Sequence, residues 1–194
     1  YSNLSGITIV DSDFSNANLT GANLTDAGLW GVTLDGVRSG GITGVPSSLP
    51  IGWSLISGYL IGPKANLTGA DLTNADLTGA NLSGATLDGV RSGGITGLSA
   101  TLPSGWKLIN GFLIGPKANL TNADLSGTDL SGAILDGVES GYITGQPTAL
   151  PTHWNLISGY LIGPKANLSN ADLKNADLTN ADLTNADLSG ADLT

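Results

Sequence analysis

The sequence predicts an all-β protein in which the chain bends once in every five residues and winds into a coil. Leucine stands at every fifth position of "ADLKNADLTNADLTNADLSGADLT", which runs from Ala171 to Thr194. Asn, Asp, Gly, Ser and Thr recur around each leucine, and these residues favour turns and compete with helix. A five-residue period fits neither a regular helix nor a straight strand, so a repeated bend is required.

The period of five excludes the regular structures through the geometry of their side chains. On an α-helix each residue turns about 100°, so leucines five apart lie about 140° apart and spiral around the helix. On a straight strand an odd step puts successive leucines on opposite faces. A short extended segment followed by a bend lets every leucine point inward. Alanine, two positions before each leucine, is then the second inward residue, and it is small because the interior is narrow.

Four runs of this repeat divide the chain, centred on Leu4 to Leu34, Leu67 to Leu87, Leu120 to Leu135 and Leu168 to Leu193. We expect the central leucines to form the core and the aspartate before each of them to face solvent. The predicted core includes Leu67, Leu72, Leu77, Leu82, Leu120, Leu125, Leu173, Leu178, Leu183 and Leu188.

This pattern resembles the pentapeptide-repeat family, whose consensus is Ala-(Asp/Asn)-Leu-x-x. The resemblance implies a right-handed quadrilateral β-helix, with four repeats in each 20-residue coil and coils stacked about 4.8 Å apart. The first repeats, such as Ile7 to Asp11, depart from the consensus. On this basis we expect residues 1–194 to form a single solenoid domain of a bacterial protein.

Three related inserts interrupt the repeats, at about residues 37–64, 90–117 and 138–165. The leucines that flank them are always 33 residues apart, which indicates one folded unit used three times. Each insert has two short apolar runs around a Ser-Gly or Asn-Gly pair, a strong signal for a hairpin turn. The three predicted β-hairpins pair Trp53–Ile56 with Tyr59–Gly62, Trp106–Ile109 with Phe112–Gly115, and Trp154–Ile157 with Tyr160–Gly163.

Six aromatic residues occupy equivalent positions in these inserts, and two interpretations of them remain open. They form either a patch that binds a carbohydrate or a protein, or a small satellite core that fastens each hairpin to the coil. A hairpin alone is marginal in water, which favours the anchoring role. Trp30 directly follows its central leucine and should point outward, so it is the better surface candidate. The six insert aromatics are Trp53, Tyr59, Trp106, Phe112, Trp154 and Tyr160.

The composition argues against catalysis and against several kinds of binding. Sixteen acidic and seven basic residues give a formal net charge of −9 without a basic stripe, so direct nucleic-acid binding is not expected. There is no cysteine, a single histidine (His153), and no apolar run near the roughly 18 residues of a membrane span. A core filled by leucine and alanine leaves no cavity for a small-molecule substrate. We therefore expect no enzyme activity, no catalytic residues, no cofactor and no metal site.

Nine aspartates directly precede central leucines, from Asp71 to Asp192. Asp172 and Asp192 are 20 residues apart and would stack in neighbouring coils. Such pairs could hold calcium or serve as an acid–base pair. A solvated acidic face is the favoured interpretation, because the predicted face is flat and has no histidine and no wall to exclude water.

The leading functional hypothesis is a structural or interaction scaffold that binds itself or another protein. The repeats begin at Asn3–Leu4 and end at Asp192–Leu193 without a cap. This predicts either a fragment of a longer protein or head-to-tail stacking into an extracellular fibre or sheath. We expect an extracellular or cell-surface location, with the cytoplasm as the alternative.

Two alternative functions differ in class from a scaffold. By resemblance, the chain could be an acidic mimic of duplex DNA that modulates DNA gyrase, although no C-terminal helical segment for dimerisation follows Leu193. The other alternative is binding to ice or carbohydrate surfaces through ladders of threonines such as Thr68 and Thr73. These threonines are spread over four faces, which argues against a single threonine-rich plane.

Overall fold

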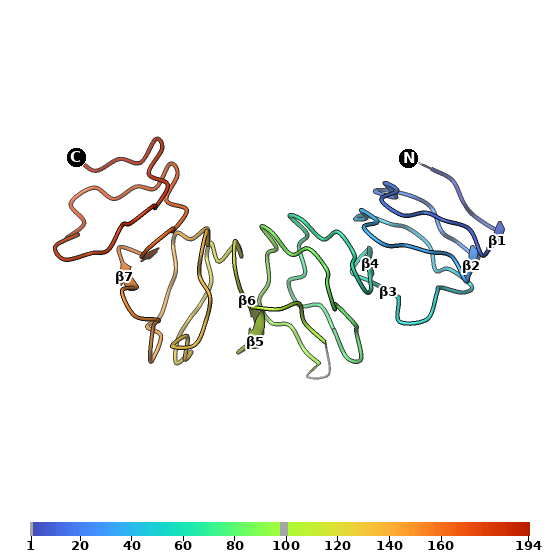
Figure 1. Cartoon of the computed structure of the whole chain (residues 1–194), viewed down its shortest axis with the longest axis horizontal. Helices are drawn as coiled ribbons and strands as arrows, with labels where there is room; N and C mark the ends of the chain where they lie inside the picture. Colours follow the sequence, from blue (N-terminus) through green and yellow to red (C-terminus); the bar gives the residue numbers. More distant parts are fainter. Residues whose placement is uncertain (1, 98–100) are drawn as a thin grey trace. The chain divides into compact units, whose positions relative to one another are not determined.

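The computed structural model describes residues 2–97 and 101–194, and these residues have an all-β fold (Figure 1). They form short strands of three residues each, joined by turns and by single parallel bridges, and no helix occurs among them. The strands are β1 (Thr8–Val10), β2 (Gly28–Trp30), β3 (Ser54–Ile56), β4 (Tyr59–Ile61), β5 (Lys107–Ile109), β6 (Phe112–Ile114), β7 (Asn155–Ile157) and β8 (Tyr160–Ile162).

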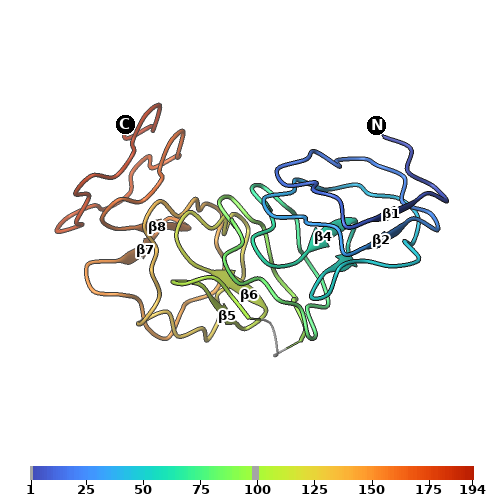
Figure 2. The same ribbon diagram turned by 45° about the vertical axis from the view of Figure 1, so that its right-hand side comes forward.

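Most of the chain winds so that residues 20 apart in the sequence pair in parallel. Asn3 bridges Asn23, which in turn bridges Thr43. The backbone N–H of Leu24 donates to the carbonyl of Thr43 at 2.9 Å, and similar bonds recur around the coil. The longest parallel pairing joins β1 to β2 over their full length, and Figure 2 shows the two strands side by side. These features describe a β-helix-like fold.

Most of the described five-residue repeats end in a turn that is built in the same way. The Asn or Asp before the central residue accepts a hydrogen bond from the backbone N–H two residues later. Thr20 donates in this way to Asn18 at 3.0 Å, and Thr78 donates to Asp76 at 2.9 Å. Two positions after the centre the backbone has a positive φ, as at Gly21 (69°), which Gly and Asn adopt most easily. Gly and Asn therefore occupy this position in most of the described repeats.

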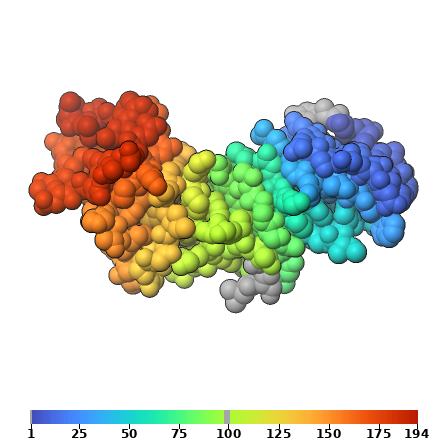
Figure 3. Space-filling model, viewed as in Figure 1, coloured from blue at the N-terminus to red at the C-terminus, as the bar shows by residue number. Residues whose placement is uncertain are grey.

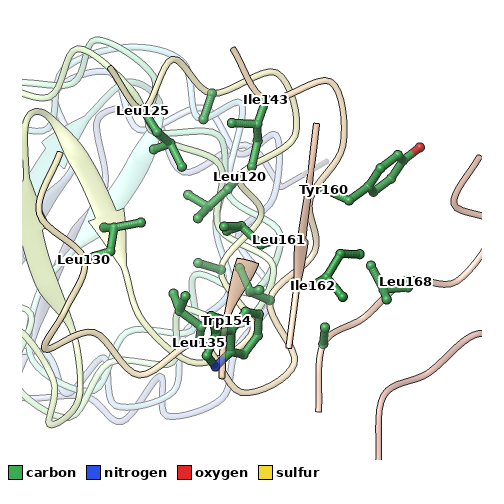
Figure 4. Close-up of a cluster of buried hydrophobic side chains, with 14 of the residues drawn as sticks. Leu120, Leu125, Leu130, Leu135, Ile143, Trp154, Tyr160, Leu161, Ile162 and Leu168 are labelled. Atoms are coloured by element: carbon green, nitrogen blue, oxygen red, sulfur yellow. The ribbon is translucent and has the colours of Figure 1, made fainter. Parts of the chain in front are cut away.

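The chain divides into two compact units, Tyr1–Leu87 with Ile95–Ser104, and Asp88–Gly94 with Gly105–Thr194. In each unit the core includes the central leucines, the alanines that precede them and residues of the strand pairs. In the second unit, Figure 4 shows Leu120, Leu125 and Leu130 pointing into the interior of the coil. Figure 3 shows that side chains fill the gaps that separate the ribbons of neighbouring coils. The single domain over residues 1–194 stays a prediction.

The predicted core leucines differ in burial between the inner coils and the last one. Seven of them are buried: Leu67, Leu72, Leu77, Leu82, Leu120, Leu125 and Leu173. Leu178, Leu183 and Leu188 are only half-buried, so the expected burial was too deep at these three positions. The reason is that another coil of this chain lies against only one side of the coil that contains them.

Each insert enlarges one coil by eight residues, and one row of parallel bridges continues past it. Arg38 bridges Asn66, Arg91 bridges Asn119, and Glu139 bridges Asn167, so the step is 28 residues in place of 20. The additional residues belong to three antiparallel strand pairs, β3–β4, β5–β6 and β7–β8. Each predicted strand extends one residue beyond the observed one at its outer end. The connecting residues all have positive φ, as in a type I′ turn: Ser57–Gly58, Asn110–Gly111 and Ser158–Gly159.

Candidate interaction surfaces

The insert tryptophans lie on glycines at the end of the neighbouring strand. A Cβ atom added at Gly62 would overlap the indole of Trp53, and the same is true of Gly115 with Trp106 and Gly163 with Trp154. Trp154 is buried, whereas Trp53 and Trp106 are half-buried. Glycine at these positions thus lets an indole ring lie directly on the backbone, which fixes the base of each strand pair.

Tyr59, Phe112 and Tyr160 begin the second strand of each pair, and their rings lie against Gly40, Gly93 and Gly141. These three glycines have φ values between 147° and 156°, a region that residues with a Cβ rarely adopt. The rings therefore need glycine for both the space and the backbone conformation. Figure 4 shows the ring of Tyr160 directed away from Leu120 and Leu125 in the core.

The first strand pair is inserted between two coils at one corner. On one side the N–H of Ile42 donates to the carbonyl of Gly58 at 3.1 Å. On the other side the N–H of Asp71 donates to the hydroxyl of Tyr59 at 3.1 Å, and Asp172 and Tyr160 form the same bond in the third insert. At equivalent positions of other coils this backbone N–H donates to a backbone carbonyl of the preceding coil. Here the tyrosine hydroxyl of the strand pair replaces that carbonyl as the acceptor.

A serine that takes the place of a central leucine completes this junction. The hydroxyl of Ser39 accepts a hydrogen bond from the N–H of Leu60 at 2.9 Å. Ser92 and Ser140 accept equivalent bonds from Leu113 and Leu161. The side chains of Leu60, Leu113 and Leu161 are fully buried, so each strand pair contributes a leucine to the core. The role of these serines was not predicted from the sequence, although each stands in the repeated "GVRSG" or "GVESG" motif.

Trp30 belongs to an exposed apolar surface in the first unit. Val10 lies opposite Trp30 in the β1–β2 pairing, and Ile51 lines a cavity of about 240 Å³ together with Trp30. The exposed fractions are 48% for Val10, 62% for Trp30 and 98% for Ile51. Large apolar side chains that are exposed together mark interaction sites more often than single ones do. We refer to Val10, Trp30 and Ile51 as the Trp30 patch.

The other two inserts carry polar residues at the positions that correspond to the Trp30 patch. Ser83 and Ser131 correspond to Trp30, and Ser104 and Thr152 correspond to Ile51. The coil does not need an apolar residue at these positions, since two of the three inserts fold without one. The Trp30 patch is therefore specific to the coils at the first insert and is not a general feature of the repeat.

The aspartates before the central leucines are engaged in turns at the surface. The side chain of Thr78 and then its backbone N–H lower the pKa of Asp76 by hydrogen bonding, and Ser126 does the same to Asp124. Asp172 and Asp192 bridge neighbouring coils, but the carboxylate of Asp192 pairs with Lys174 at 2.9 Å. Residues 2–97 and 101–194 contain no group of three His, Cys, Asp or Glu side chains arranged to hold a metal ion.

The basic residues divide into paired lysines and unpaired arginines. Three lysines form exposed ion pairs of 2.5 to 2.7 Å with the aspartate of each "LDG" turn, in Lys64–Asp35, Lys117–Asp88 and Lys165–Asp136. Arg38 and Arg91 make no side-chain hydrogen bond or ion pair within the described parts of the chain. His153 is exposed in a turn with a φ of 67°.

Arg38 lines a groove of about 600 Å³ at the corner where the first strand pair separates two coils. The groove, here called the Arg38 groove, is bordered by the ring of Tyr59, by three threonines, and by backbone of three consecutive coils. Its other lining residues are Thr20, Gly21, Ser39, Gly40, Gly41, Thr43, Thr68, Gly69 and Ala70. A cavity for a small-molecule substrate was not expected from the sequence, whereas this corner has a groove.

Comparisons with known proteins identify a family and similar solved structures. A family model described as "Pentapeptide repeats" matches in eight copies, at residues 2–38, 64–91, 116–139 and 165–194. The chain is also similar to HetL, a pentapeptide repeat protein involved in heterocyst differentiation regulation from the cyanobacterium Nostoc sp. strain PCC 7120. The two are 24% identical, over 98% of this chain and 86% of that one, with a TM-score of 0.23. A search of curated protein sequences gives no significant match.

The described residues contain no helix that could cross a membrane.

Proposed function

This chain belongs to the pentapeptide-repeat family, and we propose on that premise that it is a non-enzymatic scaffold that binds another protein. Its coils support this role because leucine and alanine fill their interior, so that the functional groups lie on the outer faces. Catalysis needs convergent polar groups in a site that excludes water. The aspartates on these faces instead lie in solvent and accept hydrogen bonds from their own turns.

The observation that carries the proposal is the Trp30 patch. Tryptophan is enriched among residues that dominate the binding energy of protein interfaces, where it fills a pocket on the partner. Val10 and Ile51 extend the apolar surface on both sides of Trp30, and a partner that covers them would remove all three side chains from water. The proposed contact is therefore an apolar pocket of a second protein that receives the indole of Trp30.

The fold of the scaffold follows from the length of its coils. Four turns in each 20-residue step support four flat faces, and we infer that the coils are right-handed and quadrilateral, with each strand pair a β-hairpin inserted at one corner. On a faceted surface, side chains 20 residues apart lie in a row. This accounts for the alignment of Val10 with Trp30.

The experiment compares photocrosslinking from two equivalent positions. A photoreactive phenylalanine analogue replaces Trp30 in one variant and Ser83 in the other, and the protein is irradiated in cells that express it. A partner should be captured from position 30 and not from position 83, and the addition of Ile51→Ser should reduce its capture. Equal capture from both positions would overturn the proposal.

Self-association through coil edges is the second candidate function. Every coil presents both N–H and carbonyl groups at each of its edges, and such edges already pair within each unit. The N–H of Leu173 donates to the carbonyl of Asp192 at 2.8 Å, and the N–H of Asp192 donates back to the carbonyl of Ala171 at 2.9 Å. A copy added to such an edge would extend the coil into a filament, for which an extracellular sheath is the proposed setting. Light scattering over a range of protein concentrations tests this. If the chain forms filaments, its average molecular mass should rise with concentration. The rise should persist in the Trp30→Ser variant, because the coil edges and not the Trp30 patch would make the contact.

The acidic faces support a third candidate, mimicry of duplex DNA towards DNA gyrase. Carboxylates with lowered pKa, such as that of Asp124, remain ionised at neutral pH and could occupy a surface that binds phosphates. A supercoiling assay tests the idea directly. Unchanged gyrase activity at a large excess of the protein would exclude it.

A further inference from the structure

The three inserts are not equivalent at the corner where the Arg38 groove lies. The first reads Arg38-Ser39-Gly40-Gly41, whereas the third has Glu139 in place of arginine and Tyr142 in place of the second glycine. The two residues between these positions make the same contacts in both inserts. Ser140 and Gly141 contact the third strand pair just as Ser39 and Gly40 contact the first. The third insert therefore serves as an internal comparison, in which a side chain of the protein occupies the corner that is open in the first insert.

In the third insert an aromatic side chain covers the ring of the strand pair. The rings of Tyr142 and Tyr160 have centroids 6.5 Å apart at an interplanar angle of 46°. Tyr160 is 7% exposed as a result, whereas Tyr59 of the first insert is half-buried. Gly41 has no side chain to cover Tyr59. The space that the phenol ring of Tyr142 takes in the third insert is thus open in the first.

The charge at this corner is reversed as well. Arg38 stands where the third insert has Glu139, and its guanidinium makes no side-chain hydrogen bond or ion pair with described residues. Arg38 is exposed, in a chain with seven basic and sixteen acidic residues. A guanidinium presents its donors in a planar fork that matches the two oxygens of a carboxylate. The groove also exposes the hydroxyls of Thr20, Thr43 and Thr68.

From these residues we propose that the Arg38 groove binds a short oligosaccharide that carries a uronic acid. One sugar ring lies against Tyr59 in the space that corresponds to Tyr142, its carboxylate binds Arg38, and its hydroxyls bond to the threonines. The volume of about 600 Å³ falls within the range of about 300 to 1,000 Å³ that is usual for small-ligand sites. A long polyanion is disfavoured because the remaining surface is acidic, so the ligand is a short chain or a chain end.

The second insert could also bind the ligand, because it keeps Arg91, Gly93 and Gly94 and has Phe112 in place of tyrosine. The experiment therefore uses Arg91→Glu as its background, which leaves the first insert as the site under test. Isothermal titration measures the affinity for digalacturonate, with its methyl ester as the uncharged control. Near-ultraviolet circular dichroism verifies that each variant is folded.

Digalacturonate should bind to the Arg91→Glu protein, and its methyl ester should bind at least about tenfold more weakly. Arg38→Glu and Gly41→Tyr, each added to this background, should both reduce the affinity for digalacturonate by at least about tenfold, because they introduce the residues of the third insert. The opposite exchange, Glu139→Arg with Tyr142→Gly, should add one binding site to the titration.

Three results would overturn the proposal. The first is no binding of digalacturonate to the unmodified protein. The second is an unchanged affinity after Arg38→Glu in the Arg91→Glu background. The third is equal or tighter binding of tetraglutamate, which would mean that the groove recognises carboxylates in a peptide and has no preference for a sugar ring. The Trp30 patch is outside this groove, so failure here leaves the proposed scaffold function standing.

Discussion

The indole ring of Trp53 lies directly on the backbone of Gly62, so closely that a Cβ atom at this glycine would overlap three atoms of the ring. The two residues are at the base of the β3–β4 pair, where the strand pair leaves and rejoins the coil. Trp106 with Gly115 and Trp154 with Gly163 repeat the contact. This contact makes the strand pairs sensitive to a single methyl group.

Gly62→Ala should lower the free energy of unfolding by about 1–3 kcal/mol, the usual cost of an added methyl group in a well-packed site. The indole of Trp53 must move to accommodate it. Gly28→Ala is the matched control, because its Cβ would lie 3.5 Å from the nearest atoms, an ordinary contact, and it should change stability by less than about 0.5 kcal/mol. Urea denaturation measures both, and equal effects would contradict the close contact.

Truncation of a central leucine should cost more in an inner coil than in the last one. Leu77→Ala removes a side chain with no exposed surface and should cost about 2–5 kcal/mol. Leu183→Ala removes a half-buried side chain and should cost less than about 2 kcal/mol. Denaturant midpoints with an unchanged m-value would establish the comparison. A cost at Leu183 as high as at Leu77 would show that its side chain is covered in solution.

The hydroxyl of Tyr59 should contribute measurably to stability. Tyr59→Phe removes the acceptor of the Asp71 N–H and should cost about 0.5–1.5 kcal/mol. Tyr142→Phe makes the same chemical change at a side chain that is 69% exposed, and it should be close to neutral. Thermal unfolding of the two variants, measured in parallel, shows whether loss of the Tyr59 hydroxyl lowers stability more than loss of the Tyr142 hydroxyl. A neutral Tyr59→Phe would mean that the bond makes no net contribution.

The turn aspartates should make the protein sensitive to acid. The pKa of Asp76 is lowered in the folded state by the side chain and then the backbone N–H of Thr78. A carboxyl group of this kind stabilises the fold at pH values above its unfolded pKa, about 3.9, and this contribution is lost as the pH falls through the lower folded pKa. Stability should therefore decrease between about pH 5 and pH 2.

Asp76→Asn isolates the contribution of one turn. Asparagine keeps an acceptor for the Thr78 N–H, as Asn18 does for Thr20, but it does not titrate. The variant should lose less stability than the parent between pH 5 and pH 2, as measured by urea denaturation at each pH. A parallel loss in both proteins would assign the acid sensitivity to other carboxyl groups.

The repeat frame could be predicted from the sequence because one geometric fact determines it. Only a bend in every five residues lets Leu72 and Leu77 point to the same interior, and both are buried. The strand pairs could be located for a similar reason, since the Ser57–Gly58 pair between two apolar runs specifies a tight turn. Their outer ends were predicted one residue too long, because Trp53 leaves the strand to lie on Gly62.

The junctions between inserts and coils could not be predicted, because they depend on contacts between residues far apart in the sequence. Ser39 stands in the place of a central leucine, and nothing local indicates that its hydroxyl accepts from Leu60, 21 residues away. The hydroxyl of Tyr59 similarly reaches Asp71 of the following coil. The Arg38 groove results from these contacts, so it has no sequence signal beyond the difference between "RSGG" and "ESGY".

The 28-residue step from Arg38 to Asn66 has a consequence for how such a gene can change in length. Because the Arg38–Asn66 bridge carries the parallel pairing past the insert, a stretch from one central leucine to the equivalent leucine of the next insert begins and ends at the same position of the five-residue frame. Tandem duplication or loss of such a stretch, by recombination between the nearly identical segments around Leu34 and Leu87, would preserve the five-residue frame of the coils. The sequences of the inserts can then diverge separately, as the difference between Gly41 and Tyr142 illustrates, while the repeat frame of the coil stays the same.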